Sequence, residues 1–280
     1  MRIRTLVVVA LLALSIVAGI FLWLSIREFA PLRVVFLDVG QGDAILITEG
    51  DTQVLIDGGA ESRQLLGQLG RFVPFWDHRI ETVIATHPDA DHIGGLAAVI
   101  RRYRVGHFLS NGAEGQSGAA ADLRQSLERS SETDQAVLGA GSKLVFPGGA
   151  ELSVLFPAGG AAADLEETNE GSIVARLEYG QASFLLTGDL PHEEAVLPDI
   201  EPAHVLKVAH HGSKYSTSDA WLARVQPKVA IVSVGKNRYG HPADEVLRRL
   251  QAIGTEVLRT DEIGNIVFVC HQDVCVRERR

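Results

Sequence analysis

The pattern of hydrophobic positions divides the chain into an apolar N-terminal run and a body of short alternating segments. The run extends from Thr5 to Ile26 and is interrupted only by Ser15, Gly19 and Ser25. About 20 apolar residues in a helix are enough to cross the hydrocarbon core of a bilayer. From Arg33 onward, short apolar runs are separated by Gly and Asp, which is typical of strands and turns. We therefore predict an anchor or signal segment over residues 1–32 and one domain over 33–280.

The charges around the apolar run bear on where the domain lies. Arg2 and Arg4 precede the run, so the positive-inside rule predicts that the N-terminus stays in the cytoplasm and the domain lies outside, although Arg27 on the far flank weakens this orientation. A cleaved signal peptide is the alternative, but its apolar region is usually only about 7–15 residues long. The best cleavage point, after Ala30, is followed by Pro31, which argues against cleavage. We expect a membrane-anchored extracytoplasmic domain, or a secreted one if the segment is removed.

The body predicts strands that alternate with helices. Strands are expected at Arg33–Asp38, Ala44–Thr48, Gln53–Ile56, Thr82–Ala85, Val105–Leu109, Lys143–Phe146, Glu151–Phe156, Ser172–Glu178, Ser183–Leu186, His204–Val208, Val229–Val234, Glu256–Arg259 and Asn265–Val269. Helices are expected at Ser62–Phe72, Gly94–Arg102, Ala121–Arg129, His192–Leu197, Ser218–Val225 and Ala243–Ile253. Two β-rich halves with helices between them predict an α/β fold, a four-layer αββα sandwich. Residues 111–142, polar and rich in Gly, Ala and Ser, are expected to form a peripheral insertion of lower order.

The chain is acidic, with a net charge of −9. Residues 1–32 hold three arginines and one glutamate, so the rest has a net charge of −11. Proteins that bind nucleic acid over an extended surface normally have a basic surface. The charge therefore argues against extended DNA binding more than against phosphoester chemistry at a small site.

The two cysteines, Cys270 and Cys275, lie in a segment that predicts two short strands joined by a tight turn. Opposed positions in a hairpin can satisfy disulfide geometry, and a disulfide fits an oxidising exterior. Two unpaired thiols, or a Cys-His-Cys metal site with His271, are the alternatives.

The strongest chemical signal is Thr86–Gly95, a segment that places His87, Asp89, Asp91 and His92 within six residues. Two imidazoles and two carboxylates this close compete for protons unless cations hold them together. Because the segment follows an apolar strand and precedes a helix, we predict a metal site, with two ions, on that loop.

Three further segments deliver similar side chains to the ends of apolar strands. Asp189 ends one strand, His210 and His211 follow a second, and His241 lies beyond a third. A site built by several rigid strand ends is a common way to fix ligand geometry.

These segments, in their order and spacing, resemble the metallo-β-lactamase superfamily and within it the extracytoplasmic hydrolase domain of ComEC/Rec2-type competence proteins. The resemblance covers about residues 33–270. It is carried by Phe36–Asp43, Leu55–Gly59, Thr86–Gly95, Asn169 with Ser172, Leu186–Asp189, His210–Ser213 and Gly240–Pro242. Those proteins also carry a many-helix channel part, whereas this sequence shows a single apolar run, so we expect a stand-alone relative to which the channel role does not transfer.

The resemblance implies one ion held by His87 and Asp89 and a second held by Asp91 and His92. Asp189 would bridge the two, and His211 would complete the second ion's shell; His210 is the alternative at that turn. Most members of the family have His where this chain has Asp89, and a further His where it has Asn169. The extra oxygen ligands keep Zn²⁺ as a candidate and make Mn²⁺ a competitor.

The chemistry that the resemblance implies is hydrolysis by a metal-bound hydroxide, with Asp91 and Asp189 in the catalytic centre. Asp57 would orient ligands or their loop. Lys214 and His241 would hold or protonate substrate oxygens. Asp38 and Asp43 are expected to accept hydrogen bonds from backbone amides of a turn.

The expected function is a membrane-anchored phosphodiesterase or nuclease whose substrate is a phosphodiester, with DNA as the candidate polymer. A hydrolase of a small ester (a choline-type phosphodiester, a lactone or a β-lactam) is the first alternative. A non-catalytic, metal-stabilised module that binds DNA or protein is the second.

Overall fold

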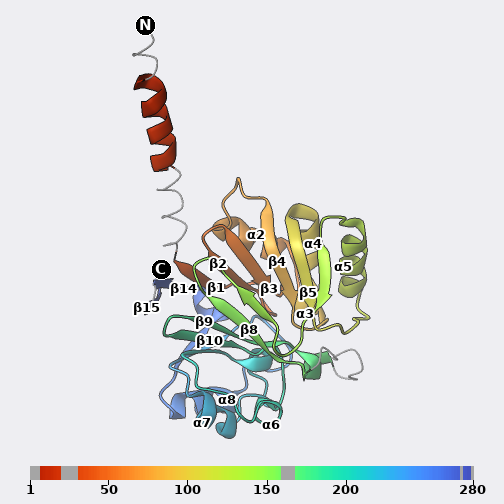
Figure 1. Ribbon diagram of the computed structural model, residues 1–280. Helices are drawn as coiled ribbons and strands as arrows, with labels where there is room; N and C mark the ends of the chain where they lie inside the picture. The colour runs from red at the N-terminus through yellow and green to blue at the C-terminus, as the bar shows by residue number, and fades with distance from the viewer. Residues whose placement is uncertain (1–6, 20–30, 159–167, 272–273, 279–280) are drawn as a thin grey trace.

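The structure is a computed structural model that describes residues 7–19, 31–158, 168–271 and 274–278. Within these residues two β-sheets stack face to face, with helices on both outer surfaces (Figure 1). The predicted α/β sandwich is therefore confirmed.

The first sheet has eight strands in the order β15-β14-β1-β2-β3-β4-β5-β6 within the described residues. Their bounds are β1 Leu32–Phe36, β2 Ile45–Glu49, β3 Thr52–Ile56, β4 Arg79–Ala85, β5 Arg104–Ser110, β6 Asp134–Val137, β14 Ile266–His271 and β15 Val274–Arg277. The second sheet has seven, in the order β13-β12-β11-β10-β9-β8-β7. Their bounds are β7 Lys143–Val145, β8 Glu151–Phe156, β9 Val174–Tyr179, β10 Ala182–Leu186, β11 Val205–Lys207, β12 Val229–Val232 and β13 Glu256–Arg259.

The helices connect these strands. The α-helices are α2 Ser62–Phe72, α3 Ala90–Ile93, α4 Leu96–Arg102, α5 Gly118–Arg129, α6 Glu193–Val196, α7 Asp219–Val225, α8 Asp244–Ala252 and α9 Thr260–Ile263. Two short 3₁₀ helices are η2 Thr168–Gly171 and η3 Ala209–Gly212.

Three layers of buried apolar side chains separate the four layers of secondary structure. Between the sheets, Phe268 packs edge-on against Phe36 and Phe184, with ring centroids 6.2 and 5.4 Å apart. Outside the first sheet the core comes from α2, α4 and α5, and outside the second from α7 and α8. Alternation along strands such as β1 lets one face of each strand enter the central core and the other an outer core.

The predicted insertion over 111–142 is wrong in one respect. Within it, α5 buries Leu123 and Leu127 in the outer core, and β6 pairs in parallel with β5 as the last strand of the first sheet. Every residue of β6 is exposed, so the strand carries no apolar alternation by which the sequence pattern could identify it.

Cys270 and Cys275 lie opposite each other on β14 and β15 and form a disulfide. The sequence left three possibilities for these cysteines, and the structure shows the disulfide.

Residues 7–19 are helical, and large apolar side chains from Val7 to Val17 are exposed on them. Among the described residues, none of the helices combines the length and apolar character that a membrane span requires. The predicted anchor also includes residues 5–6 and 20–26, which lie outside the described residues.

Candidate metal centre

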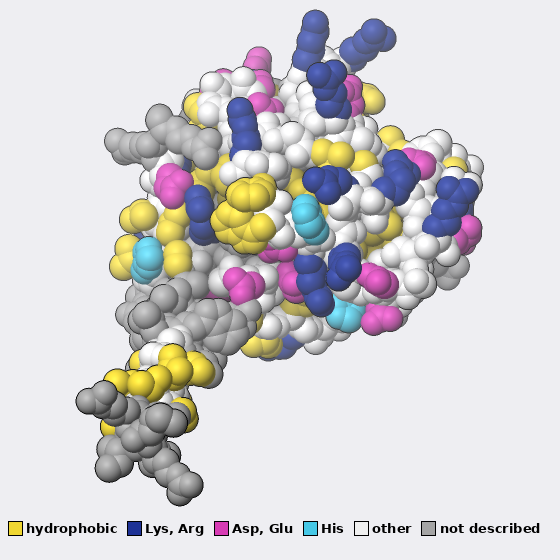
Figure 2. Space-filling model, turned by 90° about the horizontal axis from the view of Figure 1, so that it is seen from above, with side chains coloured by type: hydrophobic (Ala, Val, Ile, Leu, Met, Phe, Trp, Pro, Cys, Tyr) yellow, Lys and Arg dark blue, Asp and Glu magenta, His cyan; other side chains and the backbone are white. Residues whose placement is uncertain are grey.

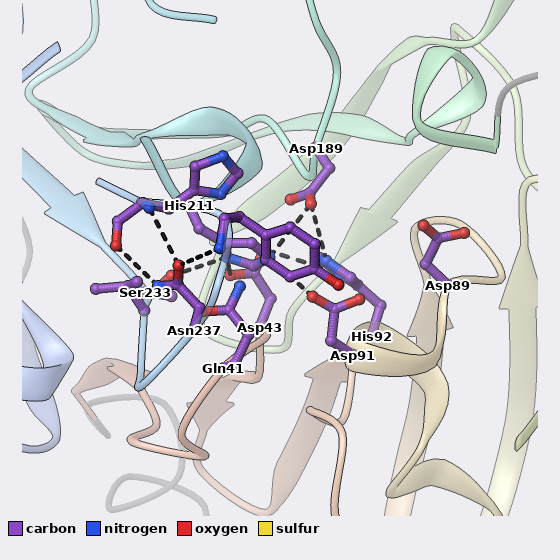
Figure 3. Close-up of polar contacts among 12 residues, drawn as sticks. Gln41, Asp43, Asp89, Asp91, His92, Asp189, His211, Ser233 and Asn237 are labelled. Carbon is purple, nitrogen blue, oxygen red and sulfur yellow. Dashed lines mark hydrogen bonds and ion pairs between the residues drawn. The ribbon is translucent and has the colours of Figure 1, made fainter. Parts of the chain in front are cut away.

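The candidate centre lies where strands of both sheets end. The connection after β4 and the short helix α3 carry His87, Asp91 and His92, while the turn after β10 carries Asp189 and η3 carries His211. In Figure 3 the side chains of Asp91, His92, Asp189 and His211 point toward one another. Because β10 and β11 are parallel neighbours, their C-terminal ends deliver Asp189 and His211 to one edge.

Three buried histidines of this cluster share one arrangement. The Nδ1 of His87 lies 3.0 Å from the hydroxyl of Thr86, and that hydroxyl donates in turn to Asp57. The Nδ1 of His92 lies 2.8 Å from Asp57 Oδ2, and the Nδ1 of His211 lies 2.8 Å from the backbone oxygen of Ser233. Each partner accepts a hydrogen bond, so each Nδ1 carries the proton. The Nε2 lone pair of each neutral ring is then left to face the centre.

The Nε2 atoms of the three rings have no hydrogen-bond partner although all three side chains are buried. Several sets of three ligand-type atoms lie around them, and within each set the atoms are no more than 4.8 Å apart. One set comes from His87, His92 and Asp189, and another comes from Asp91, His92 and His211. Orphaned acceptor nitrogens beside carboxylates are what a divalent cation requires. The donor set therefore fits a metal centre.

The carboxylates approach the same nitrogens. Asp189 Oδ2 lies 3.2 Å from His92 Nε2 and 3.3 Å from His211 Nε2, while Asp91 Oδ2 lies 3.3 Å from His211 Nε2. Asp189 thus faces histidines of both sets, which is the position that a bridging ligand needs.

The pKa values show that this buried cluster needs positive charge. Burial alone lowers the pKa of His92, but the carboxylates of Asp189 and Asp57 raise it well above its usual value. For His211 the same opposition leaves the pKa raised to about 9. Burial and the charge of His92 lower the pKa of His87 well below its usual value. Divalent cations supply positive charge without a proton on any imidazole, and their binding releases the protons.

Asp43 and Lys207 also belong to this centre, which the sequence analysis did not anticipate. Lys207 is fully buried, pairs with Asp43, and lies 3.4 Å from Asp189 Oδ1. Its ammonium also donates to the backbone oxygen of Gly188 at 2.7 Å. Asp43 lies 3.6 Å from His211 Nδ1, and its expected role as a turn cap is wrong, because its side chain accepts no backbone hydrogen bond among the described residues. Asp38 does accept from Gly40, as expected.

The loop that carries Asp43 is fixed against the motif by Gly42. A Cβ on Gly42 would lie 1.9 Å from the backbone oxygen of Asp91, and its φ of +118° is strained for other residues. Asp43 N then donates to that same oxygen at 3.3 Å. Glycine at this position is the sequence signal by which Asp43 could have been placed at the centre.

Asp89 lies at the margin of the centre. Its Oδ2 is 3.9 Å from His87 Nε2, its Oδ1 accepts from Thr168, and Figure 3 shows it apart from the other carboxylates. Among the described residues it belongs to none of the sets of ligand-type atoms around His92. Asn169, expected where relatives have a further His, has a buried Oδ1 without a hydrogen-bond partner.

His210, His241 and Lys214 lie around the centre. The half-buried ring of His210 is 6.3 Å from the ring of His211 and 5.3 Å from that of His241. His241 has a buried Nδ1 without a partner, whereas exposed Lys214 places its ammonium 4.9 Å from the ring centroid of Tyr215. The structure thus places His241 beside His210, and the role expected of Lys214 stays a prediction.

Asp57 holds the candidate ligands through hydrogen bonds on the side of the rings away from the centre. Its carboxylate accepts from the backbone NH and hydroxyl of Thr86 and contacts His92 Nδ1, and its own φ is +60°. Strained backbone at a non-glycine residue persists where surrounding contacts fix it. The expected orienting role of Asp57 agrees with these contacts.

Asp57→Asn is expected to lower the affinity for the metal by about 10–100-fold, because the amide leaves His92 without a charged acceptor. Competition with a coloured chelator measures this affinity. Asp77→Asn is a matched control, since Asp77 also accepts two hydrogen bonds but lies away from the centre. Unchanged affinity in Asp57→Asn would show that Asp57 only holds the backbone.

A buried carboxylate holds the segment that follows His211. Glu193 accepts from Thr217 N at 2.9 and 3.1 Å, and Thr217 has a φ of +55°. Burial raises the pKa of Glu193 to about 7, against the smaller lowering by its hydrogen bonds. Since His210 and His211 also have positive φ, at 49° and 53°, the turn is strained and Glu193 helps to stabilise it.

The raised pKa of Glu193 predicts that the free energy of unfolding depends on pH. The folded protein holds the Glu193 proton more tightly than the unfolded chain, so stability falls as pH rises from about 4.5 to about 7. The loss amounts to about 3 kcal/mol. Urea unfolding across this range should show that slope in the native chain and not in Glu193→Gln. Parallel curves for the two proteins would refute the assignment.

Comparison with known proteins gives a consistent result. A family model described as the metallo-beta-lactamase superfamily matches residues 37–236. ComE operon protein 3 of Bacillus subtilis is 33% identical over 256 residues, 83% of this chain and 32% of that protein. Competence protein ComA of Neisseria gonorrhoeae is 29% identical over 237 residues, 82% of this chain and 31% of that protein. The chain thus spans about a third of the length of these relatives.

Among solved structures, the metallo-beta-lactamase fold protein YhfI from Bacillus subtilis aligns with 86% of this chain and 99% of that one. The TM-score is 0.59 and the identity is 15%, so the likeness shows a shared fold.

Proposed function

The chain belongs to the metallo-beta-lactamase superfamily, and from this membership and the geometry of its centre we propose that it is a metal-dependent phosphodiesterase. The resemblance expected from the sequence motifs, to the superfamily and to competence proteins, is confirmed. The reaction and its substrate are our proposal.

The observation that carries the proposal is the convergence of three buried Nε2 atoms without partners on Asp91 and Asp189. A protein that only binds DNA or a partner has no need to bury these atoms without partners, since each costs free energy. We assign His87, His92, Asp91, Asp189 and His211 as the residues that would hold two divalent ions, with Asp89 at the edge. Bound ions would lower the pKa of water and polarise a phosphoryl oxygen.

The side chains around the centre would have distinct roles. Asp57 and Ser233 fix the orientation of His92 and His211, and Lys207 offsets the negative charge that Asp43 and Asp189 bring into a buried place. We propose that His241, whose ring lies 5.3 Å from that of His210, would donate a proton to the leaving oxygen. Its Nδ1 is buried without a hydrogen-bond partner, although the residue as a whole is partly exposed.

Two observations favour a phosphodiester over a small carboxylic ester. Carboxylates form a large part of the ligand set, which suits harder ions such as Mn²⁺ beside Zn²⁺. One relative is named for competence, the uptake of DNA, so DNA is the substrate class that we propose. The net charge of −9 fits a site that holds a short stretch of strand more than a long one.

We also propose that the N-terminal apolar segment anchors the domain at the outer face of a membrane. The Cys270–Cys275 disulfide supports this location, because disulfides persist in oxidising compartments. The apolar run 5–26 contains no arginine or lysine, and Arg2, Arg4 and Arg27 flank it.

The test is a substrate and metal screen on the purified chain. We expect about two ions per chain. In the presence of Mn²⁺ or Zn²⁺ we also expect hydrolysis of bis-p-nitrophenyl phosphate and single-stranded DNA. We expect no hydrolysis of β-lactam or lactone substrates. Asp91→Ala should fold and lack activity, while Asp122→Ala, at an exposed ion pair, should keep it. A stable, metal-free protein would refute the hydrolase, and lactone cleavage alone would favour the small-ester alternative.

A further inference from the structure

The loop between α2 and β4 carries two adjacent aromatic side chains into solvent. Phe75 is 86% exposed and Trp76 is 70% exposed, and their rings pack edge to face with centroids 4.8 Å apart. Singly exposed apolar residues are ordinary on soluble proteins. A pair of large aromatic rings at a loop tip is the kind of feature that marks an interaction surface.

Four exposed arginines lie toward the same edge of the first sheet. Arg71 is in the last turn of α2, Arg102 ends α4, Arg104 begins β5 and Arg129 ends α5. Arg104 N donates to the backbone oxygen of His78, in the loop that follows the two rings, at 2.7 Å. In the described part of the chain no carboxylate pairs with any of these four, whereas Arg79 and Arg101 do have acidic partners. Figure 2 shows an apolar patch on this face with several Lys and Arg side chains near it, and with Asp and Glu side chains also at its border. On a chain of net charge −9 this local excess calls for an anionic partner.

The chain enters the domain at this same edge. Leu32, the first residue of β1, pairs with Glu49 at the end of β2, next to the turn into β3. From β3, Gln53 donates to Asp77 at 2.6 Å, which joins that turn to the aromatic loop. Leu32, where β1 begins, therefore lies at the same edge of the first sheet as the loop that carries Phe75 and Trp76.

The candidate metal centre lies at the other end of the same strands. The aromatic loop precedes β4 and Arg104 begins β5, whereas His87 follows the C-terminal end of β4. In Figure 1, α3 marks the centre at the opposite end of β4 and β5 from the aromatic loop. A partner bound at the edge that carries Phe75 and Trp76 would therefore leave the metal centre accessible to substrate.

We propose that this edge docks on the surface of an anionic lipid bilayer, with Phe75 and Trp76 in the interfacial region and the four arginines on lipid phosphates. Trp is enriched at membrane interfaces because its ring is amphipathic, and each basic side chain near an anionic surface strengthens binding. The inference rests on the proposed N-terminal anchor and is independent of the reaction. It specifies an orientation, with the metal centre facing away from the membrane.

The test places an environment-sensitive fluorophore on the full chain through Phe75→Cys, with the native disulfide intact. A control label at Ile253→Cys sits on a residue 49% exposed at the end of α8, on the other side of the sandwich. Both proteins are reconstituted into phosphatidylcholine vesicles with and without phosphatidylglycerol. Quenching by brominated lipids is measured after flotation.

Several-fold stronger quenching at position 75 than at 253, increased by phosphatidylglycerol, is expected. Arg102→Glu with Arg104→Glu should abolish that increase, while Lys228→Glu with Arg248→Glu should keep it. Flotation with equal, weak quenching at both positions would overturn the docking surface and leave the anchor intact. Failure to float would overturn the anchor and the docking surface together, and neither result would affect the phosphodiesterase assay.

Discussion

Asp189→Asn is expected to lower kcat/KM for a phosphodiester by more than about a hundredfold, the upper range for residues that only support a metal ligand. The carboxylate lies within 3.3 Å of both His92 Nε2 and His211 Nε2. Burial raises the pKa of Asp189, but the neighbouring His211, His92 and Lys207 lower it well below its usual value, so the group stays ionised. An amide at this position is neutral and cannot bridge two cations.

Metal content and activity must be measured on the same preparation. We expect Asp189→Asn to bind fewer ions per chain than the native protein while its circular dichroism stays native. Asp122→Asn is the matched control, because its exposed carboxylate pairs only with Arg101 among the described basic residues. Full metal content with full activity in Asp189→Asn would remove Asp189 from the bridging position.

Lys207→Met is expected to lower the free energy of unfolding by about 3–5 kcal/mol, the usual cost of leaving buried charges without their partner. The ammonium is 1% exposed and lies among Asp43, Asp189 and the backbone oxygen of Gly188. Burial alone would lower the pKa of Lys207, but Asp43 and Asp189 raise it, so the side chain remains a cation. Methionine has a similar length but leaves both carboxylates without this charge.

Denaturant unfolding with chelator present measures the loss without contribution from bound metal. Lys143→Met is the control, because its exposed pair with Glu151 is worth only about 0–1 kcal/mol. Adding Asp43→Asn to Lys207→Met should recover part of the loss, since it removes one of the unpaired charges. A loss no larger than that of Lys143→Met would show that water or ions replace Lys207 readily.

Much of the fold could be predicted because its elements carry local patterns. The strand Glu151–Phe156 and the helix Ser62–Phe72 have the predicted bounds, because the first alternates apolar residues and the second places Leu65 and Leu69 one turn apart. The fully exposed β6 was missed, since its pairing with β5 depends on the backbone and not on side-chain pattern. The predicted helix Gly94–Arg102 corresponds to α4, Leu96–Arg102, and the separate short helix α3, Ala90–Ile93, was not predicted.

Only part of the candidate centre could be predicted from the sequence. His87, Asp91 and His92 could be found because a short segment holds them all, and Asp189 and His211 because each follows an apolar strand. Lys207 could not, since a lone Lys in a strand is ordinarily a solvated side chain. The role expected of Lys214 stays a prediction, since the structure shows its exposed ammonium only over the ring of Tyr215.

The sequence by itself determined the superfamily, the sandwich of two sheets and the presence of a histidine and aspartate cluster, because these depend on residue types and spacings within short segments. Only the tertiary structure decided which nitrogen of each histidine faces the centre, that Asp43 and Lys207 join it, and that Asp89 lies at its margin. Those features depend on contacts between strands far apart in sequence. Their energies are set by burial, which changes the charge and hydrogen bonding of every group it surrounds.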